Sequence, residues 1–195
     1  MNLIRIATAA DAPALVDLYA PFILHTGITQ ETEVPSIPEF AERITDTLPQ
    51  RPWLVCEING VIAGYAYAGK YRDRKGYQWS IEPSVYIHEK FYRHNIATAL
   101  YTALFEILKM QGFVNAYAVI TLPNEKSIRF HKKFGFADFT IYRKVGYKLN
   151  QWHDVAWLFL QVNEYAANMK DPIPFSQLNK EVLSTILENG SKQVY

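Results

Sequence analysis

The most constraining feature of this 195-residue sequence is one run, residues 84–100, whose hydrophobic periodicity changes halfway. Residues 84–87 alternate as in a β-strand, residues 89–95 are polar and basic, and an apolar helical pattern begins at Ile96. A helix that starts directly after a short basic loop leaves its first backbone N–H groups free to bind an anion. The run therefore predicts a strand, an anion-binding loop and a helix, in that order.

The same helix is predicted to end at Gly112, and the residues that follow it are rich in β-forming side chains. Strand, helix and strand make a βαβ unit, whose two strands should be parallel and connected right-handedly. The alternation of apolar residues elsewhere completes an α/β fold of the α+β type, with a mixed central sheet of about seven strands and flanking helices. The predicted strands are residues 4–6, 53–58, 61–68, 77–87, 113–121, 137–149 and 152–162.

Capping signals place the remaining helices. Thr8 and Asp11 begin a helix that is predicted to end near Tyr19, before an irregular segment at residues 21–35, and Ser36 opens a capping box for a helix to about residue 48. Asn124 is predicted to cap a short helix that Gly135 closes. We expect residues 1–162 to form one domain and residues 163–195 to form a C-terminal extension with one helix, at 175–188. That helix packs on the domain, or covers a partner or a second copy.

Composition narrows the possible classes of protein. A formal net charge of +1 argues against nucleic acid as a partner, and no apolar run approaches the roughly 20 residues that span a bilayer. The first residues lack the basic, apolar and small-residue regions of a secretory signal peptide, so a cytoplasmic location is expected. The single cysteine, Cys56, excludes an internal disulfide and reads as a buried strand residue. The histidines show no metal-ligand spacing, so no metal site is expected.

The order of elements, the basic loop and the Asn-capped helix ending in KFGF (residues 133–136) resemble the GCN5-related N-acetyltransferases (GNAT). In that family the loop carries Gln/Arg-x-x-Gly-x-Gly/Ala, whereas residues 92–97 read YRHNIA, so that Ala97 matches and Asn95 stands at a glycine position. A longer likeness, over residues 4–162, is to the phosphinothricin and methionine sulfoximine N-acetyltransferase subgroup. It rests on residues 52–55 (PWLV), 63–69 (AGYAYAG), 77–82 (YQWSIE), 84–87 (SVYI), 100–102 (LYT), 110–113 (MQGF), 118–120 (AVI), 122–124 (LPN) and 152–155 (WHDV).

The resemblance implies that acetyl-CoA is the acetyl donor. The basic loop and the first helical turn would hold its pyrophosphate, and the strand end would pair with the pantetheine arm, with a backbone N–H near Ile87 facing the thioester carbonyl. Asparagine tolerates left-handed backbone better than most residues, so Asn95 is compatible with such a loop. The implied cofactor-binding residues are Val85, Tyr86, Ile87, Arg93, His94, Asn95, Ile96, Ala97, Thr98 and Asn124.

Two residues are implied in catalysis. Glu82 matches the proposed base of the subgroup, and burial would raise its pKa and help it accept the proton of an amine. Alternatively, Glu82 is a sheet-face carboxylate paired with Arg74 or Lys75. His131 stands where the wider family usually has tyrosine, and it would protonate the leaving thiolate, act in a relay with Glu82, or simply pack.

The resemblance also implies the acceptor. Arg74 and Tyr77 match positions that resemble substrate contacts in the subgroup, and a guanidinium suits the carboxylate or phosphinate of an amino acid analogue. Thr29 is a candidate for the opposite wall, and Glu82 is also expected to contact the substrate. We therefore predict direct acetyl transfer to the α-amino group of a small amino acid analogue such as L-phosphinothricin or L-methionine sulfoximine, by a homodimer without a membrane partner. The alternatives are an N-acetyltransferase for another amino acid or amine, and a non-catalytic acyl-CoA sensor. The sequence Trp152-His153-Asp154 is expected to fix a hairpin or a dimer contact.

Overall fold

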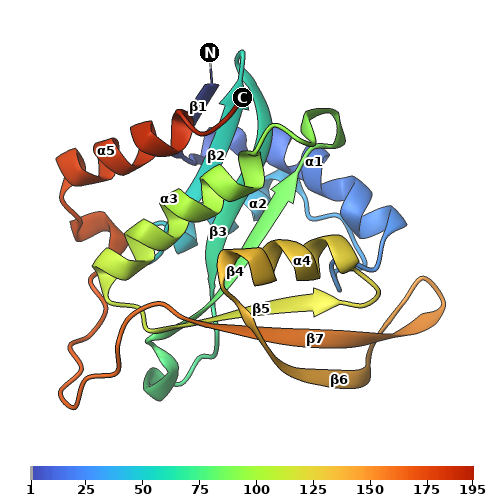
Figure 1. Ribbon diagram of the computed structural model, residues 1–195. Coiled ribbons are helices and arrows are strands. Elements are labelled where there is room, and N and C mark those ends of the chain that lie inside the picture. Colours follow the sequence, from blue (N-terminus) through green and yellow to red (C-terminus); the bar gives the residue numbers. More distant parts are fainter. Residues whose placement is uncertain (1) are drawn as a thin grey trace.

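A seven-stranded sheet with helices on both faces forms the frame of the protein, in a computed structural model that describes residues 2–195 (Figure 1). Strands β4 and β5 are parallel, and the other neighbouring pairs are antiparallel. This confirms the predicted mixed sheet and its βαβ unit. In spatial order the strands are β1 (Asn2–Ile6), β2 (Trp53–Ile58), β3 (Val61–Lys70), β4 (Ser80–Ile87), β5 (Asn115–Thr121), β7 (Gln151–Gln161) and β6 (Ala137–Lys148).

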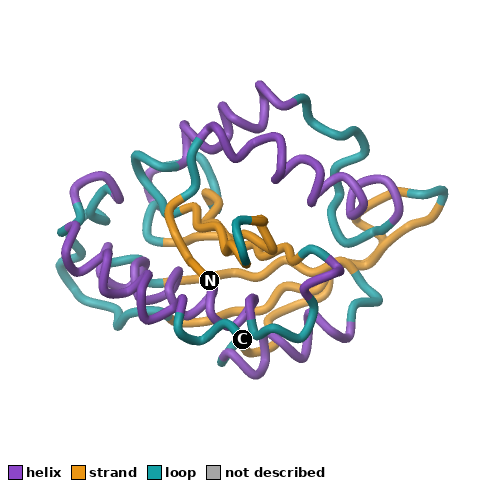
Figure 2. Tube along the Cα trace, turned by 90° about the horizontal axis from the view of Figure 1, so that it is seen from above, coloured by secondary structure: helices purple, strands orange, loops and turns teal. Residues whose placement is uncertain are grey.

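The helices divide between the two faces of the sheet, as the view from above shows (Figure 2). Helices α1 (Ala12–His25) and α2 (Ile37–Thr47) enclose one core, which is rich in aromatic side chains. Helices α3 (Ile96–Gln111), α4 (Glu125–Phe134) and α5 (Lys180–Ser191) enclose a larger core on the other face. The short 3-10 turns are η1 (Ala9–Asp11), η2 (Lys75–Tyr77), η3 (Glu89–Phe91) and η4 (Phe175–Gln177).

The predicted start of α2, end of α3 and start of α4 are confirmed. The Ser36 hydroxyl accepts from the Glu39 N–H at the start of α2, and Asn124 Oδ1 accepts from the Ser127 N–H, 3.2 Å away, at the start of α4. Gly112 ends α3 with a left-handed φ of +87° that a side chain would strain. Cys56 is buried in β2, as expected, and burial raises the pKa of its thiol to about 12.

Several boundaries differ from the prediction. Helix α1 continues past Tyr19 and through Pro21 to His25, because the following turn buries Ile23 in the aromatic core and so offsets the missing hydrogen bond. Strand β4 begins at Ser80, after η2, rather than at residue 77. Helix α5 begins at Lys180 and runs through Gly190 instead of ending there. A Cβ at Gly190 would lie 3.3 Å from Ala103 Cβ, so the glycine permits close packing of α5 on α3.

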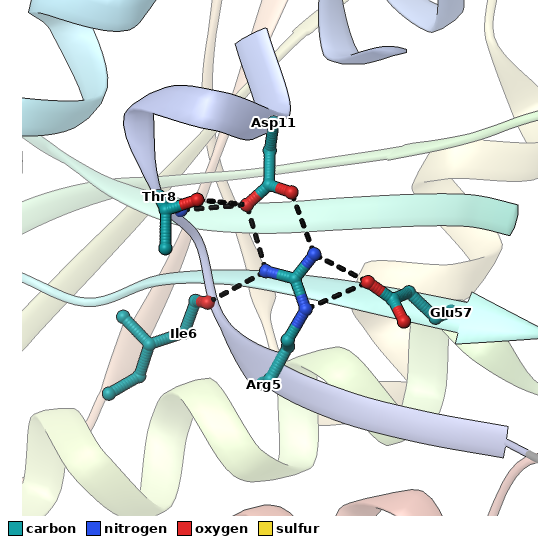
Figure 3. A network of polar contacts seen from close by, with 5 residues as sticks. All are labelled: Arg5, Ile6, Thr8, Asp11 and Glu57. Carbon is teal, nitrogen blue, oxygen red and sulfur yellow. Dashed lines mark hydrogen bonds and ion pairs between the residues drawn. The ribbon is translucent and has the colours of Figure 1, made fainter. Parts of the chain in front are cut away.

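A partly buried ion cluster ties the first strand to its neighbours (Figure 3). The Arg5 guanidinium donates to both oxygens of Asp11, at 2.8 and 2.7 Å, and to the Glu57 carboxylate on β2. Asp11 also accepts from the Thr8 N–H at 2.7 Å, which confirms the predicted capping pair. Burial opposes ionisation of Asp11, but the hydrogen bonds from Arg5 and Thr8 outweigh it and lower the pKa of the carboxyl.

Candidate active site

The site is built where β4 and β5 part from each other. Their parallel pairing covers Ser80 with Asn115 and Ile81 with Ala116, and no pairing follows in the described residues. Pro83 is the next residue of β4 whose N–H would point toward β5, and proline has no N–H to continue the ladder. The two strands therefore separate immediately after Ile81.

The separation leaves unpaired backbone groups on β4. In an antiparallel pair, alternate residues direct their N–H and C=O groups to the same neighbour. The His88 N–H donates to Ala63 O on β3, at 2.9 Å, so the backbone of Val85 and Ile87 faces the opposite side, toward the gap. An extended chain laid in the gap would find these groups free, as a peptide finds the edge of a sheet.

A small cavity of about 70 Å³ lies in this gap. It brings together predicted residues from β4 and α4, and it adds Tyr101 and Ser127, which were not predicted. Its lining is Ile28, Pro83, Ser84, Val85, Tyr86, Tyr101, Ala118, Val119, Ile120, Asn124, Ser127 and His131.

The predicted anion-binding loop lies above the gap, at the start of α3. Arg93 and Asn95 both have left-handed backbone, with φ of +73° and +57°. Neither α3 nor the rest of the described chain supplies an acceptor for the N–H groups of Ile96, Ala97 and Thr98. The first turn of α3 thus presents free donors, reinforced by the helix dipole, which is the arrangement that suits a phosphate.

Glu82 is the first residue of β4 after the last pair with β5. Strand alternation places it with Tyr86 on the face covered by α1 and α2. Burial raises the pKa of the Glu82 carboxyl, and the positive charge of Arg72, whose Nη1 lies 3.8 Å from Oε1, partly opposes that rise. A half-buried carboxylate with a raised pKa is suited to accept a proton near neutral pH.

His131 approaches the gap from the other face of the sheet. It is 5 % exposed, and its Nδ1 lies 2.8 Å from the backbone carbonyl of Ser127. Because a carbonyl only accepts, the proton of the neutral ring is on Nδ1, and Nε2 accepts from the Tyr101 hydroxyl 3.1 Å away. Burial lowers the pKa of His131, against the opposing effect of the Ser127 bond, so the ring is neutral at pH 7. In the sequence, Tyr101 could have been noticed only as a tyrosine on the apolar face of the predicted helix that is now α3.

The segment between β3 and β4, residues 71–79, does not place its cations as the sequence prediction supposed. Arg72, which the prediction passed over, lies beside Glu82, and its guanidinium stacks on the rings of Tyr71 (4.8 Å) and Trp157 (5.7 Å). Lys75 forms an ion pair with Asp171 instead of Glu82. The alternative pairing of Glu82 with Arg74 or Lys75 is therefore wrong, because Arg72 is the cation beside the carboxylate and Lys75 pairs elsewhere.

The predicted substrate residues differ in how far their side chains are engaged. The Arg74 side chain, at the N-cap of η2, forms no hydrogen bond or ion pair with the other described residues, and Tyr77 is 44 % exposed, with its ring 5.8 Å from that of Tyr71. Thr29 is buried. Its hydroxyl lies 2.6 Å from the Tyr19 hydroxyl, and its carbonyl accepts from Lys148 Nζ at 2.8 Å.

The hairpin of β6 and β7 holds the loop that carries Thr29. His153 Nε2 lies 3.1 Å from Lys148 O, and its ring fills the space where a Cβ on Gly27 would stand. Asp154 accepts from Arg143 at 2.6 Å and from the Lys144 N–H at 2.8 Å. His153 and Asp154 therefore fix the hairpin, the first of the two roles expected for this motif.

A second, larger cavity of about 310 Å³ lies on the aromatic face, away from Glu82 and His131. Its lining is Tyr19, Glu31, Phe40, Arg43, Asp46, Thr47, Trp53, Tyr65 and Tyr67. Within residues 2–195, no cluster of three His, Cys, Asp or Glu side chains is arranged to hold a metal ion. Over the same residues, none of the helices combines the length and apolarity needed to cross a membrane.

Comparison with known proteins gives consistent matches. The family model described as an acetyltransferase (GNAT) domain matches residues 4–157. A phosphinothricin N-acetyltransferase from Streptomyces viridochromogenes is 38% identical over 154 residues, which cover 79% of this chain and 84% of the relative. An L-methionine sulfoximine/L-methionine sulfone acetyltransferase from Salmonella typhimurium is 33% identical over 165 residues, covering 84% and 96%.

A solved structure agrees with the arrangement of the sheet. The crystal structure of a GNAT superfamily phosphinothricin acetyltransferase from Sinorhizobium meliloti, in complex with AcCoA, superposes with a TM-score of 0.81. It is 29% identical, and the match covers 86% of this chain and 92% of that one.

Proposed function

This chain belongs to the GNAT acetyltransferase family and is an acyltransferase, and we propose that it acetylates the α-amino group of a small amino acid analogue. L-phosphinothricin and L-methionine sulfoximine are the acceptors we propose, because relatives at 38% and 33% identity are named for them. The observation that carries the proposal is the gap between β4 and β5, with free backbone groups along it and Glu82 at its origin. Membership in a family of enzymes counts against the alternative of a non-catalytic sensor.

Acetyl-CoA, when bound, supplies an activated thioester carbonyl. We propose that the N–H groups of residues 93–98 bind its pyrophosphate, with Arg93 adding positive charge. Val85, Tyr86 and Ile87 would hold the peptide-like arm along β4, where the backbone of Val85 and Ile87 is unpaired. Asn124 shapes the wall of the gap by capping α4.

Glu82 is our proposed base. An amine is protonated at pH 7 and cannot attack a carbonyl, so a carboxylate must accept its proton, directly or through water. Two observations support this role: the pKa of Glu82 is raised, and Glu82 lies on the sheet face covered by α1 and α2, opposite His131. We name this the acceptor face, because we propose that the amine binds there.

The leaving thiolate needs a hydrogen-bond donor on the other face. We propose that the Tyr101 hydroxyl is that donor: its single proton lies on the bond to His131 Nε2 in the free protein and turns to the sulfur as the thiolate leaves. His131 positions the hydroxyl beforehand, because the neutral ring presents a lone pair, not a proton, at Nε2. Both residues line the gap, and Tyr101 belongs to the core on the opposite face of the sheet from Glu82. This refines the expectation that His131 itself donates to sulfur.

We propose that Arg72 binds the acid group of the acceptor, together with Arg74 and Tyr77. Substituting Arg72 with alanine should raise the KM for the acceptor about tenfold or more, since a hydrogen bond to a charged group is worth about 1.5–3 kcal/mol. The KM for acetyl-CoA should not change. The measurement is initial rates with each substrate varied, for Arg72→Ala and for Arg74→Ala in parallel, with the smaller rise in KM expected at Arg74. A larger effect at Arg74 than at Arg72 would contradict the assignment.

The function itself is tested by thiol release from acetyl-CoA with a panel of amines. Rapid release with L-phosphinothricin or L-methionine sulfoximine, and slow release with polyamines, is the expected result. Faster release of CoA with an unrelated amine would show that our proposed acceptor is wrong and that the acceptor belongs to the class of that amine. Binding of acetyl-CoA without release from any amine would overturn the proposal.

Assembly and location stay predictions. The expected homodimer is consistent with exposed aromatic side chains on the β6–β7 hairpin, where Phe139 is 62 % and Trp152 is 60 % exposed. We retain a cytoplasmic homodimer as part of the proposal. Light scattering of the purified protein measures its oligomeric state.

A further inference from the structure

The chain that follows α5 returns to the loop at the start of α3. The Asn95 side-chain amide donates to Gln193 O at 3.0 Å, and the Tyr195 N–H donates to His94 O at 3.3 Å. His94 Nδ1 and Tyr195 O lie 2.5 Å apart. Residues 193–195, which we name the strap, therefore contact both residues that precede α3, although about a hundred positions separate them in sequence.

The other side of the strap is fixed to the body of the domain. Asn2 Nδ2 donates to Val194 O at 2.9 Å, and the Val194 side chain is buried at 6 % exposure. The Ile4 N–H donates to Ser191 Oγ at 2.7 Å, at the end of α5, which lies alongside α3 (Figure 1). The strap thus links β1, the edge strand of the sheet, to the loop.

The loop needs such support because its backbone is unfavourable. Left-handed φ values at Arg93 and Asn95 cost conformational free energy for residues with a Cβ. Asn95 occupies the N-cap position of α3 but does not cap it, since its side chain is directed to Gln193 instead. The interaction that holds the left-handed turn therefore comes from the strap and not from the helix.

The strap supports the loop without blocking it. Its contacts use the Asn95 side chain, the His94 ring and the His94 carbonyl. In the described chain, the N–H groups of Ile96, Ala97 and Thr98 have no partner from the strap or from elsewhere. The donors proposed to bind the pyrophosphate are left open.

We propose that the strap is a positioning segment that holds residues 93–95 in the conformation required to bind the pyrophosphate of acetyl-CoA. The inference rests on the proposed function, because it assumes that this loop binds that group. A preformed loop spares the ligand the cost of ordering it, so the strap acts on affinity and not on the chemical step. It assigns a role to residues that lie beyond the GNAT match, which ends at residue 157.

The test compares four proteins: the full chain, a chain ended at Lys192, Asn95→Ala, and both changes together. Alanine keeps the Cβ, and with it the cost of the left-handed turn, but removes the amide that reaches Gln193. CoA is titrated into each by calorimetry. Each single change should raise the Kd about fivefold, the effect of losing about one ordinary hydrogen bond. The double variant should bind hardly more weakly than either single one, since both remove the same link.

Two further readouts separate positioning from general damage. The shortened chain should show a higher KM for acetyl-CoA with kcat unchanged at saturation. Asn150→Ala, at another left-handed asparagine (φ +60°) in the distant β6–β7 turn, should bind CoA as the full chain does. If the shortened chain fails to fold, Asn95→Ala with this control still decides the question.

Three results would overturn the inference. The Kd for CoA could stay unchanged in both single variants, the two effects could add fully, or removal of the strap could tighten binding, which would make the strap a cover over the anion site. Failure of the full chain to bind CoA is a different outcome, because it rejects the proposed function itself.

Discussion

Substituting Glu82 with glutamine is expected to lower kcat by about 10²- to 10⁴-fold, the usual contribution of a positioned general base. Glutamine preserves the size of the side chain but cannot accept the proton of the acceptor amine. The Kd for acetyl-CoA should stay the same, because Glu82 lies on the acceptor face of β4 and its backbone pairs with Gly69 on β3. The measurements are steady-state thiol release and calorimetric titration.

The pH profile gives this prediction a second readout. A base acts only when it is ionised, and burial raises the pKa of Glu82, so activity should fall as pH decreases, at a higher pH than for an ordinary carboxyl group. That acidic limb should disappear in Glu82→Gln. Glu106→Gln, at an exposed position on α3, is the control and should keep both rate and profile. Unchanged turnover in Glu82→Gln would remove the assigned role.

Substituting Tyr101 with phenylalanine is expected to lower kcat by about 10²-fold or more, because the leaving thiolate loses its hydrogen-bond donor. Tyr101 is fully buried, and phenylalanine preserves its packing while removing the hydroxyl that lies 3.1 Å from His131 Nε2. His131→Ala should cause a comparable loss. The double variant should be little worse than either single one, because the two residues act as a unit.

The matched control for Tyr101 is Tyr65→Phe, which removes a buried hydroxyl from the aromatic face. It should leave kcat close to that of the unchanged protein. The lowered pKa of His131 keeps its ring neutral through neutral pH, so its titration should not appear in the profile above pH 7. Full turnover in Tyr101→Phe with loss in His131→Ala would return the donor role to the histidine.

Local signals carried much of the fold. Asn59-Gly60 predicts the hairpin between β2 and β3, and both residues adopt positive φ there, +52° and +80°. Capping residues placed the starts of α2 and α4 because the side chain and the N–H that it accepts are three positions apart. Such features depend on a few neighbouring residues, so a sequence displays them directly.

Local signals failed where a distant contact decided the outcome. Proline normally ends a helix, yet α1 passes through Pro21 because Ile23 has a core to enter. Glycine normally ends one too, yet α5 passes through Gly190 because Ala103 lies close by on α3. Pro83 could have predicted where β4 and β5 separate, because proline lacks the N–H that would continue the hydrogen bonding between them.

The sequence alone determined the order of elements, the βαβ unit with its basic loop, and the residues implied by family likeness, Glu82 and His131 among them. Only the tertiary structure decided which groups meet: Arg72 with Glu82, Tyr101 with His131, and Asn95 with the strap. The physical reason is that periodicity and capping act over a few residues. A pair such as Asn95 and Gln193, 98 positions apart, is set by how α3, α5 and β1 pack, because that packing fixes where each polar group can find its partner.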